Sequence, residues 1–151
     1  MINGEEIGWR GFATPRLLDR HGTIGTVAVL GVLETLFHLP IFFNNGQSAA
    51  GGQNRMPFFA FTASVVVLVF LFTWLYQHTR GSLLIAIAFH ASANTWTTVL
   101  AIPSSSPTFT WLMAASGLVL VAVILLLNGT QWITRPRSGI ARAATPVAVR
   151  P

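Results

Sequence analysis

Three apolar stretches of this sequence contain side chains that can move protons, hold an oxyanion or bind a metal. They are Glu5, Glu6, Arg10, His38, His90 and Asn94. Carboxylate and imidazole groups can activate water as general bases, and imidazole and amide groups can donate hydrogen bonds to an oxyanion. Carboxylates and imidazoles also bind zinc. These six residues are therefore candidates for one hydrolytic site.

The spacing of the first cluster separates two roles. Glu6 and Arg10 are four residues apart, so on a helix they share a face and can form an ion pair that shields both charges. Glu5 lies about 100° further round the helix, so Arg10 cannot easily neutralise both carboxylates. Glu5 is the better candidate for a general base, and the Glu6–Arg10 pair is also explained as a structural contact.

The two histidines have structural explanations as well. Pro40 leaves the Leu36 carbonyl without its helical partner and can kink the helix, so a carbonyl could simply satisfy His38. His90 and Asn94 lie one turn apart and could join two helices. However, polar groups inside apolar segments are costly, and three separate insertions are hard to explain as structural contacts alone. The combination favours a shared functional site.

The elements that position these residues are predicted to be membrane helices. Charged residues make up only 9% of the 151 residues and hydrophobic residues 52%, with a mean hydropathy of +0.62. Soluble domains carry roughly a quarter charged residues, so this chain is predicted to be a polytopic membrane protein. The absence of cysteine excludes disulfides and thiolate sites. The basic residues lie in loops and at the C-terminus, so a nucleic-acid partner is not expected.

Four apolar segments are long enough to cross a bilayer as helices. They are residues 24–43, 58–76, 82–102 and 109–133. Residues 3–17 form a fifth, partial helix that carries the Glu6–Arg10 pair, ends near Pro15 and is followed by a loop over 16–22. The predicted fold class is therefore an all-α polytopic membrane helix bundle with four spanning helices and one partial N-terminal helix.

The predicted domain organisation is a membrane core over residues 3–133 and a disordered basic tail over 134–151. Residues 63–72 are apolar on every side and are expected to face lipid. Residues 85–94 are rich in alanine and serine, which favours close helix packing in the bundle interior, and Ser82 is a plausible N-cap for that helix.

Loop arginines predict the orientation of the bundle. One predicted side carries Arg16, Arg20, Arg80, Arg135, Arg137, Arg142 and Arg150, and the other carries Arg55. The C-terminus is therefore expected in the cytoplasm. The absence of lysine is typical of GC-rich genomes and indicates a bacterial cell membrane.

The polar clusters resemble the three motifs of a known family. Residues 5–10 (EEIGWR) are similar to the EExxxR motif of the CPBP family. This family, whose members are also called Abi proteins, comprises intramembrane CAAX proteases and bacteriocin-processing enzymes. The CAAX proteases include those similar to CAAX prenyl protease 2. Residues 37–40 (FHLP) resemble its second motif, and residues 90–94 (HASAN) its third, HxxxN. Order and spacing agree over about residues 3–130.

The resemblance implies an intramembrane endopeptidase that hydrolyses a peptide bond. Glu5 and His38 would activate the water, and His90 and Asn94 would stabilise the tetrahedral oxyanion. The partners would be membrane lipid and a peptide or protein substrate, with or without a prenyl group.

The same resemblance assigns Glu6 and Arg10 to orienting the site. It also offers a metal-assisted alternative, in which a divalent ion, zinc, is held by His38, His90 and a glutamate. The usual zinc-protease signature HExxH does not occur in the sequence.

Two features depart from the family pattern. Family members usually have an aromatic residue four positions before the second-motif histidine, and here that position is Glu34, which could pair with His38 or add a carboxylate to the site. The EExxxR motif normally follows several helices, so we expect an N-terminally truncated form. The alternatives are a non-catalytic membrane protein of the same fold, with an immunity or scaffold role or as an inactive fragment, and a small transporter.

Overall fold

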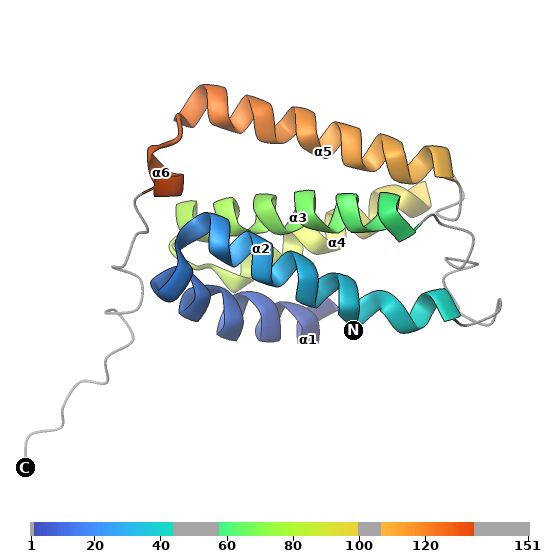
Figure 1. The fold of residues 1–151 in the computed structure, drawn as a ribbon, viewed down its shortest axis with the longest axis horizontal. Coiled ribbons are helices and arrows are strands. Elements are labelled where there is room, and N and C mark those ends of the chain that lie inside the picture. The colour runs from blue at the N-terminus through green and yellow to red at the C-terminus, as the bar shows by residue number, and fades with distance from the viewer. Residues whose placement is uncertain (1, 44–57, 100–106, 135–151) are drawn as a thin grey trace, which may run out of the picture.

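The computed structural model describes residues 2–43, 58–99 and 107–134, and the regular structure in these ranges is helical (Figure 1). The elements are α1 (Ile2–Glu6), the π-helical segment η1 (Ile7–Ala13), α2 (Thr14–Phe43), α3 (Phe58–His78), α4 (Leu83–Val99), α5 (Pro107–Asn128) and α6 (Gln131–Thr134). The predicted all-α helix bundle is confirmed. Arg55 and the predicted tail from residue 135 on lie outside the described residues.

The chain reverses direction at Gly22, inside α2. The φ of 64° and ψ of −172° at this residue are not helical, and this region of conformational space is essentially restricted to glycine. We call Ile2–His21 the first arm and Thr23–Phe43 the second arm. Figure 1 shows the two arms running back along each other, and the rings of Trp9 and Phe37 meet edge-on across them with centroids 5.9 Å apart.

The first arm is longer than the sequence predicted. The expected end near Pro15 and the loop over 16–22 are wrong, because the helix continues to His21, about 30 Å at ~1.5 Å per residue. Pro15 falls in the first turn of α2, where the missing N–H of proline is tolerated. The preceding turn is widened, since the Thr14 backbone N–H and hydroxyl both donate to the Trp9 carbonyl, the hydroxyl at 2.8 Å.

Within the part of the chain that the structure describes, three helical stretches are long and apolar enough to cross a membrane. They are Gly4–Pro40, which contains both arms, Phe58–His78 and Thr108–Asn128. By the length and composition of these helices, the chain is an integral membrane protein.

The third and fourth predicted spans differ from the observed helices. The apolar part of α4 is a shorter stretch, Leu83–Thr95. The Ile85 N–H donates to Ser82 Oγ at 3.5 Å, as the predicted N-cap requires. α5 ends at Asn128, because Gly129 turns the chain with a φ of +65° and leads into α6.

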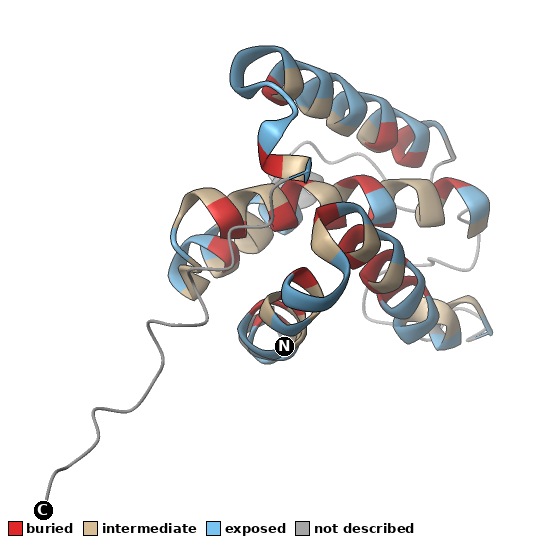
Figure 2. Ribbon diagram, turned by 60° about the vertical axis from the view of Figure 1, so that its left-hand side comes forward, coloured by how far each residue is buried: buried red, intermediate tan, exposed pale blue. Residues whose placement is uncertain are grey.

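The core lies around α3, contrary to the prediction that residues 63–72 face lipid. On one side, Val65 and Val69 pack with Val27 and Leu30 of the second arm. On the other side, α3 packs on α5 and on Trp132 of α6. Figure 2 shows buried residues along α3, whereas α4 and α5 present largely exposed or half-buried surfaces.

The expected interior position of residues 85–94 is also wrong. Ala86 is buried, whereas the other residues of this stretch are exposed or half-buried. A helix that is apolar on every side can be surrounded by protein or by lipid, and composition does not distinguish the two.

The end of the bundle at Gly22 is closed by a polar junction. Thr23 Oγ1 donates to the Trp132 carbonyl at 3.3 Å and accepts from Gln77 Nε2 at 3.1 Å. These bonds join the second arm, α3 and α6. The exposed Arg20 and Arg80 flank this end of α2 and α3, as expected for a boundary between lipid and water.

Candidate active site

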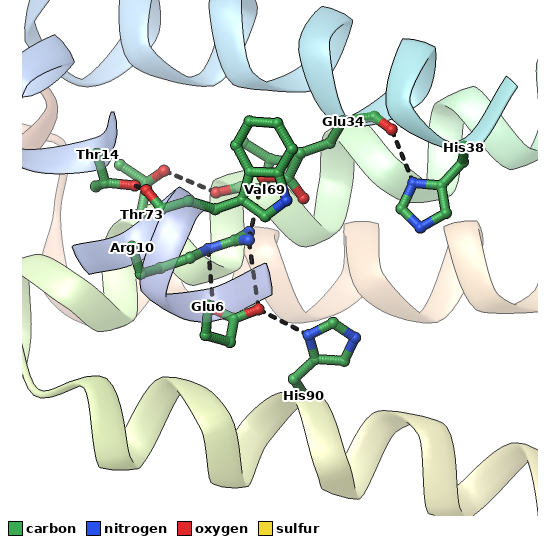
Figure 3. A network of polar contacts seen from close by, with 9 residues as sticks. Glu6, Arg10, Thr14, Glu34, His38, Val69, Thr73 and His90 are labelled. Carbon is green, nitrogen blue, oxygen red and sulfur yellow. Dashed lines mark hydrogen bonds and ion pairs between the residues drawn. The ribbon is translucent and has the colours of Figure 1, made fainter. Parts of the chain in front are cut away.

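Four residues from three helical segments form one buried polar cluster (Figure 3). Glu6 and Arg10 come from the first arm, Glu34 from the second arm and His90 from α4. The helices hold these side chains inside the bundle. Glu6 is 0%, Arg10 1% and Glu34 8% exposed. We call Glu6, Arg10, Glu34 and His90 the ion cluster.

Arg10 lies between the two carboxylates of the ion cluster. Its Nη1 is 3.1 Å from Glu34 Oε1, and its Nε is 3.4 Å from Glu6 Oε2. Nη1 also donates to Glu6 Oε1 at 3.4 Å. The predicted Glu6–Arg10 pair is therefore confirmed. The contact between Arg10 and Glu34 was not predicted, since the sequence offered Glu34 as a partner of His38 or as an additional carboxylate of the site.

His90 completes the ion cluster from α4. Its Nδ1 is 2.7 Å from Glu6 Oε1, the shortest contact in the group. Because a carboxylate only accepts hydrogen bonds, Nδ1 carries the proton and Nε2 points to the other side of the ring. Glu6 therefore determines the tautomer and the orientation of His90.

A glycine lets α4 approach the first arm this closely. A Cβ on Gly11 would lie 3.3 Å from Leu83 Cδ1, tighter than most side-chain contacts. Gly11 belongs to η1, which also contains Arg10. Widened π-helical turns of this kind occur frequently at functional sites.

An aromatic ring closes the ion cluster on the side of α3. The Arg10 guanidinium carbon lies 3.8 Å from the centre of the Phe72 ring, a cation–π distance. Arg10 Nη2 is buried and has no hydrogen-bond partner among the described residues. Phe72 was not predicted as a site residue, because an aromatic residue in an apolar helix carries no local signal of a nearby cation.

His38 is linked to the ion cluster through the main chain of Glu34. Its Nδ1 donates to the Glu34 carbonyl at 2.8 Å, which leaves Nε2 as the acceptor nitrogen of the neutral ring. A carbonyl partner was one of the predicted explanations, although it is that of Glu34 rather than Leu36. The rings of Phe37 and Phe61 pack edge-on against His38, with centroids 5.3 and 5.5 Å away.

Glu5 faces a different environment from Glu6. It is half-buried and lines an apolar cavity of about 470 Å³, together with Trp9, Phe12, Phe37 and small residues of the first arm. In the described part of the chain Glu5 has no ion pair or hydrogen-bond partner. Phe37, which lines this cavity, also packs edge-on against the His38 ring.

Asn94 is exposed on α4, one turn beyond His90, so its expected burial is wrong. α4 lies at the edge of the bundle, and Ser92, Asn94 and Thr95 are exposed there. The structure thus brings together Glu6, Arg10 and His90 but places Asn94 at the surface.

The zinc ligands that the family resemblance implies are His38, His90 and a glutamate. Among the described residues, no three His, Asp or Glu side chains are grouped so that they could hold a metal ion. The Nδ1 atoms of His38 and His90 are both engaged with protein oxygens. Zinc ligation by these two histidines stays a prediction.

Comparisons with known proteins agree with the motifs. Residues 2–96 match the family described as type II CAAX prenyl endopeptidase Rce1-like. CAAX prenyl protease 2 of Methanococcus maripaludis is 29% identical over 125 residues, which cover 82% of this chain and 45% of that protein. Efflux pump notK of Aspergillus sp. is 45% identical over 53 residues, which cover 33% of this chain and 9% of the pump.

The chain spans less than half the length of the curated relatives it matches. No solved structure matches it. The family match includes all three motifs, from the EEIGWR string to the HASAN string, and it covers most of the chain. The predicted family is confirmed, and the chain belongs to the Rce1-like family of type II CAAX prenyl endopeptidases.

Proposed function

We propose that this chain carries the catalytic residues of a membrane-embedded endopeptidase that hydrolyses a peptide bond in a CAAX-type peptide or protein. The 2.7 Å contact between Glu6 and His90 is the main support, because it joins residues 84 positions apart inside an apolar bundle. A half-buried imidazole that is held in place by a carboxylate is typical of enzymes that transfer protons.

In the proposed reaction, Glu5 and His38 act on the water. The Glu5 carboxylate takes one proton while the water oxygen forms a bond to the substrate carbonyl carbon, and His38 Nε2 orients the water by accepting a hydrogen bond from its second O–H. The carbon–nitrogen bond then breaks, and the leaving amine takes the proton from Glu5. The cavity beside Glu5 and the free acceptor of His38 support this pairing.

In the same proposal, His90 and Asn94 stabilise the oxyanion. Glu6 supplies the counter-charge for a doubly protonated His90, whose Nε2–H then donates to the developing negative oxygen. Asn94 lies one turn further along α4 and is exposed there. Glu6 and Arg10 orient the donors and do not contact the substrate.

The substrate and its setting are also proposed. The apolar cavity beside Glu5 suits the apolar part of a substrate, such as a prenyl group next to the scissile bond. The distribution of arginines supports a cytoplasmic C-terminus in a bacterial cell membrane. Zinc is a separate proposal, tested by loss of cleavage after chelation and its recovery on addition of zinc.

Cleavage of a fluorescence-quenched peptide by the protein in lipid vesicles tests the proposal. The peptide ends in a CAAX sequence and is used with and without a farnesyl group. Glu5→Gln and His90→Asn are expected to lower the rate by at least about 100-fold, the usual contribution of a general base or an oxyanion donor. The matched controls Asp19→Asn and His21→Asn change exposed residues of the first arm and should stay within about twofold of the wild type.

The outcomes separate the alternatives. Unchanged cleavage in Glu5→Gln or His90→Asn would contradict the assigned role of that residue. A wild-type protein that inserts and folds but cleaves neither peptide would favour the non-catalytic membrane protein.

A further inference from the structure

We infer that Glu34 is a positioning residue that shares Arg10 with Glu6 and thereby keeps the Glu6–His90 contact in place. The expected effect of Glu34 on turnover rests on the proposed function. The expected effect of Glu34 on the position of His90 does not. Glu34 occupies a position that is usually aromatic in the family, so the contact belongs to this chain in particular.

The first part of the inference, that Glu34 positions Arg10, follows from the contacts of the guanidinium. Nη1 is closer to Glu34 Oε1, at 3.1 Å, than to Glu6 Oε1, at 3.4 Å. The Glu34 side chain is only 11% exposed, so water does not substitute for the carboxylate. Glu34 therefore draws the guanidinium towards the second arm.

The second part of the inference is that Arg10 and His90 compete for one carboxylate oxygen of Glu6. Glu6 Oε1 accepts both His90 Nδ1 at 2.7 Å and Arg10 Nη1 at 3.4 Å. Without the Glu34 carboxylate, Arg10 would face Glu6 as its remaining counter-charge in the ion cluster. The guanidinium would then close on Glu6 and compete with His90 for Oε1.

Charge balance points the same way. With Glu34 present, one guanidinium faces two carboxylates, so Arg10 does not fully neutralise Glu6. The remaining negative charge on Glu6 is available to the His90 Nδ1–H. Removal of one carboxylate leaves a balanced Glu6–Arg10 pair and weakens this hold on His90.

The side chain and the main-chain carbonyl of Glu34 have different partners, so their effects can be tested separately. The side chain contacts Arg10, whereas the main-chain carbonyl holds His38 Nδ1 at 2.8 Å. Glu34→Gln keeps the carbonyl and the side-chain shape and removes only the charge. It should therefore perturb His90 and leave His38 unchanged.

Nitrogen NMR of ¹⁵N-histidine-labelled protein in lipid vesicles tests this directly. The protein contains four histidines, and loss of a signal in His90→Asn assigns the His90 resonance. In Glu34→Gln we expect the His90 Nδ1 signal to move. The His38 and His78 signals should stay, since both Nδ1 atoms bond to main-chain carbonyls.

Turnover provides the second readout. Glu34→Gln should lower kcat by about 10- to 100-fold with KM within about twofold, as expected for a misplaced catalytic group. The matched control is Thr26→Val, which removes a buried hydroxyl from the same arm, two turns before Glu34, and should leave both the His90 signal and kcat unchanged.

Three results would overturn the inference. An unchanged His90 signal in folded Glu34→Gln refutes it, and so does an equal shift of His38 and His90. If Glu34→Gln does not insert, Glu34→Leu carries the test, because it also removes the charge, and an unmoved His90 signal would refute the inference there too. A wild type without cleavage defeats the proposed function only, since the NMR comparison needs no turnover.

Discussion

Replacement of Arg10 by methionine tests whether the ion cluster is held by charge. Methionine keeps much of the length and the apolar contact with Phe72 but leaves Glu6 and Glu34 buried without their counter-charge. Removing one partner of a buried ion pair costs about 3–5 kcal/mol. The lost cation–π contact, 3.8 Å from the Phe72 ring, adds about 1–2 kcal/mol, of which a sulfur–aromatic contact can return about 1 kcal/mol.

The net loss expected for Arg10→Met is therefore about 3–6 kcal/mol in the free energy of unfolding, a large part of the 5–15 kcal/mol that is typical of folded proteins. The combined variant Arg10→Met/Glu6→Gln/Glu34→Leu removes all three charges and should recover most of this loss, because a buried ionic group can often be replaced by neutral residues at little cost.

Unfolding in dodecylmaltoside micelles, with sodium dodecyl sulfate as the denaturant and circular dichroism at 222 nm as the signal, measures these values. Arg16→Met is the matched control. Arg16 also lies over an aromatic ring, 3.7 Å from the centre of Phe12, but it is exposed and pairs with a main-chain carbonyl. A much smaller loss is expected there. Equal losses in Arg10→Met and Arg16→Met, or no recovery in the triple variant, would refute the explanation by buried charge.

Two glycines provide further tests with the same assay. Gly22→Ala should lower the free energy of unfolding by about 1–3 kcal/mol, because its φ of 64° is unfavourable for other residues. Gly8→Ala, where an added Cβ meets nothing within 4 Å, is its control, and equal losses would contradict strain at Gly22. Gly117→Ala should cost about 1–3 kcal/mol, since the new Cβ would clash with Val67 Cγ1 across α3 and α5. Adding Val67→Ala should restore part of that loss, and no restoration would argue against the clash.

The sequence predicted the contacts that depend on local geometry. The Glu6–Arg10 pair follows from a spacing of four residues on a helix, and the structure confirms it. Ser82 was expected at the start of α4 for the same kind of reason, and it accepts the Ile85 N–H. The fold class followed from composition, because a chain with so few charges cannot cover a soluble surface.

Contacts between distant segments could not be predicted in this way. Glu34 was a candidate partner of His38 because the two share a helix face. Its carboxylate instead meets Arg10 across the two arms. That contact requires the reversal at Gly22. Gly22 is the last residue of the loop predicted over 16–22, but the sequence does not indicate which side chains the turn brings together.

Burial was the least predictable property. Residues 63–72 carry no polar side that would indicate an interior position, yet they form the core of the described bundle. In water an apolar surface must be covered by protein, but in a membrane lipid covers it equally well, so hydrophobicity loses its usual connection with depth in the fold. The exposed position of Asn94 escaped prediction for the same reason.

The ion cluster also has a consequence for how the protein enters the membrane. Its residues leave the ribosome in the order Glu6, Arg10, Glu34 and His90, and a single charge at the centre of an inserting helix costs about 2.5–3.5 kcal/mol. Glu6 and Arg10 lie one turn apart on the first arm and can enter as a neutral pair. Glu34 then meets a cation that is already in the bilayer. A gene rearranged so that the second arm is made before the first would send Glu34 into lipid without a counter-charge, and the defect would appear at insertion, before any folding could begin.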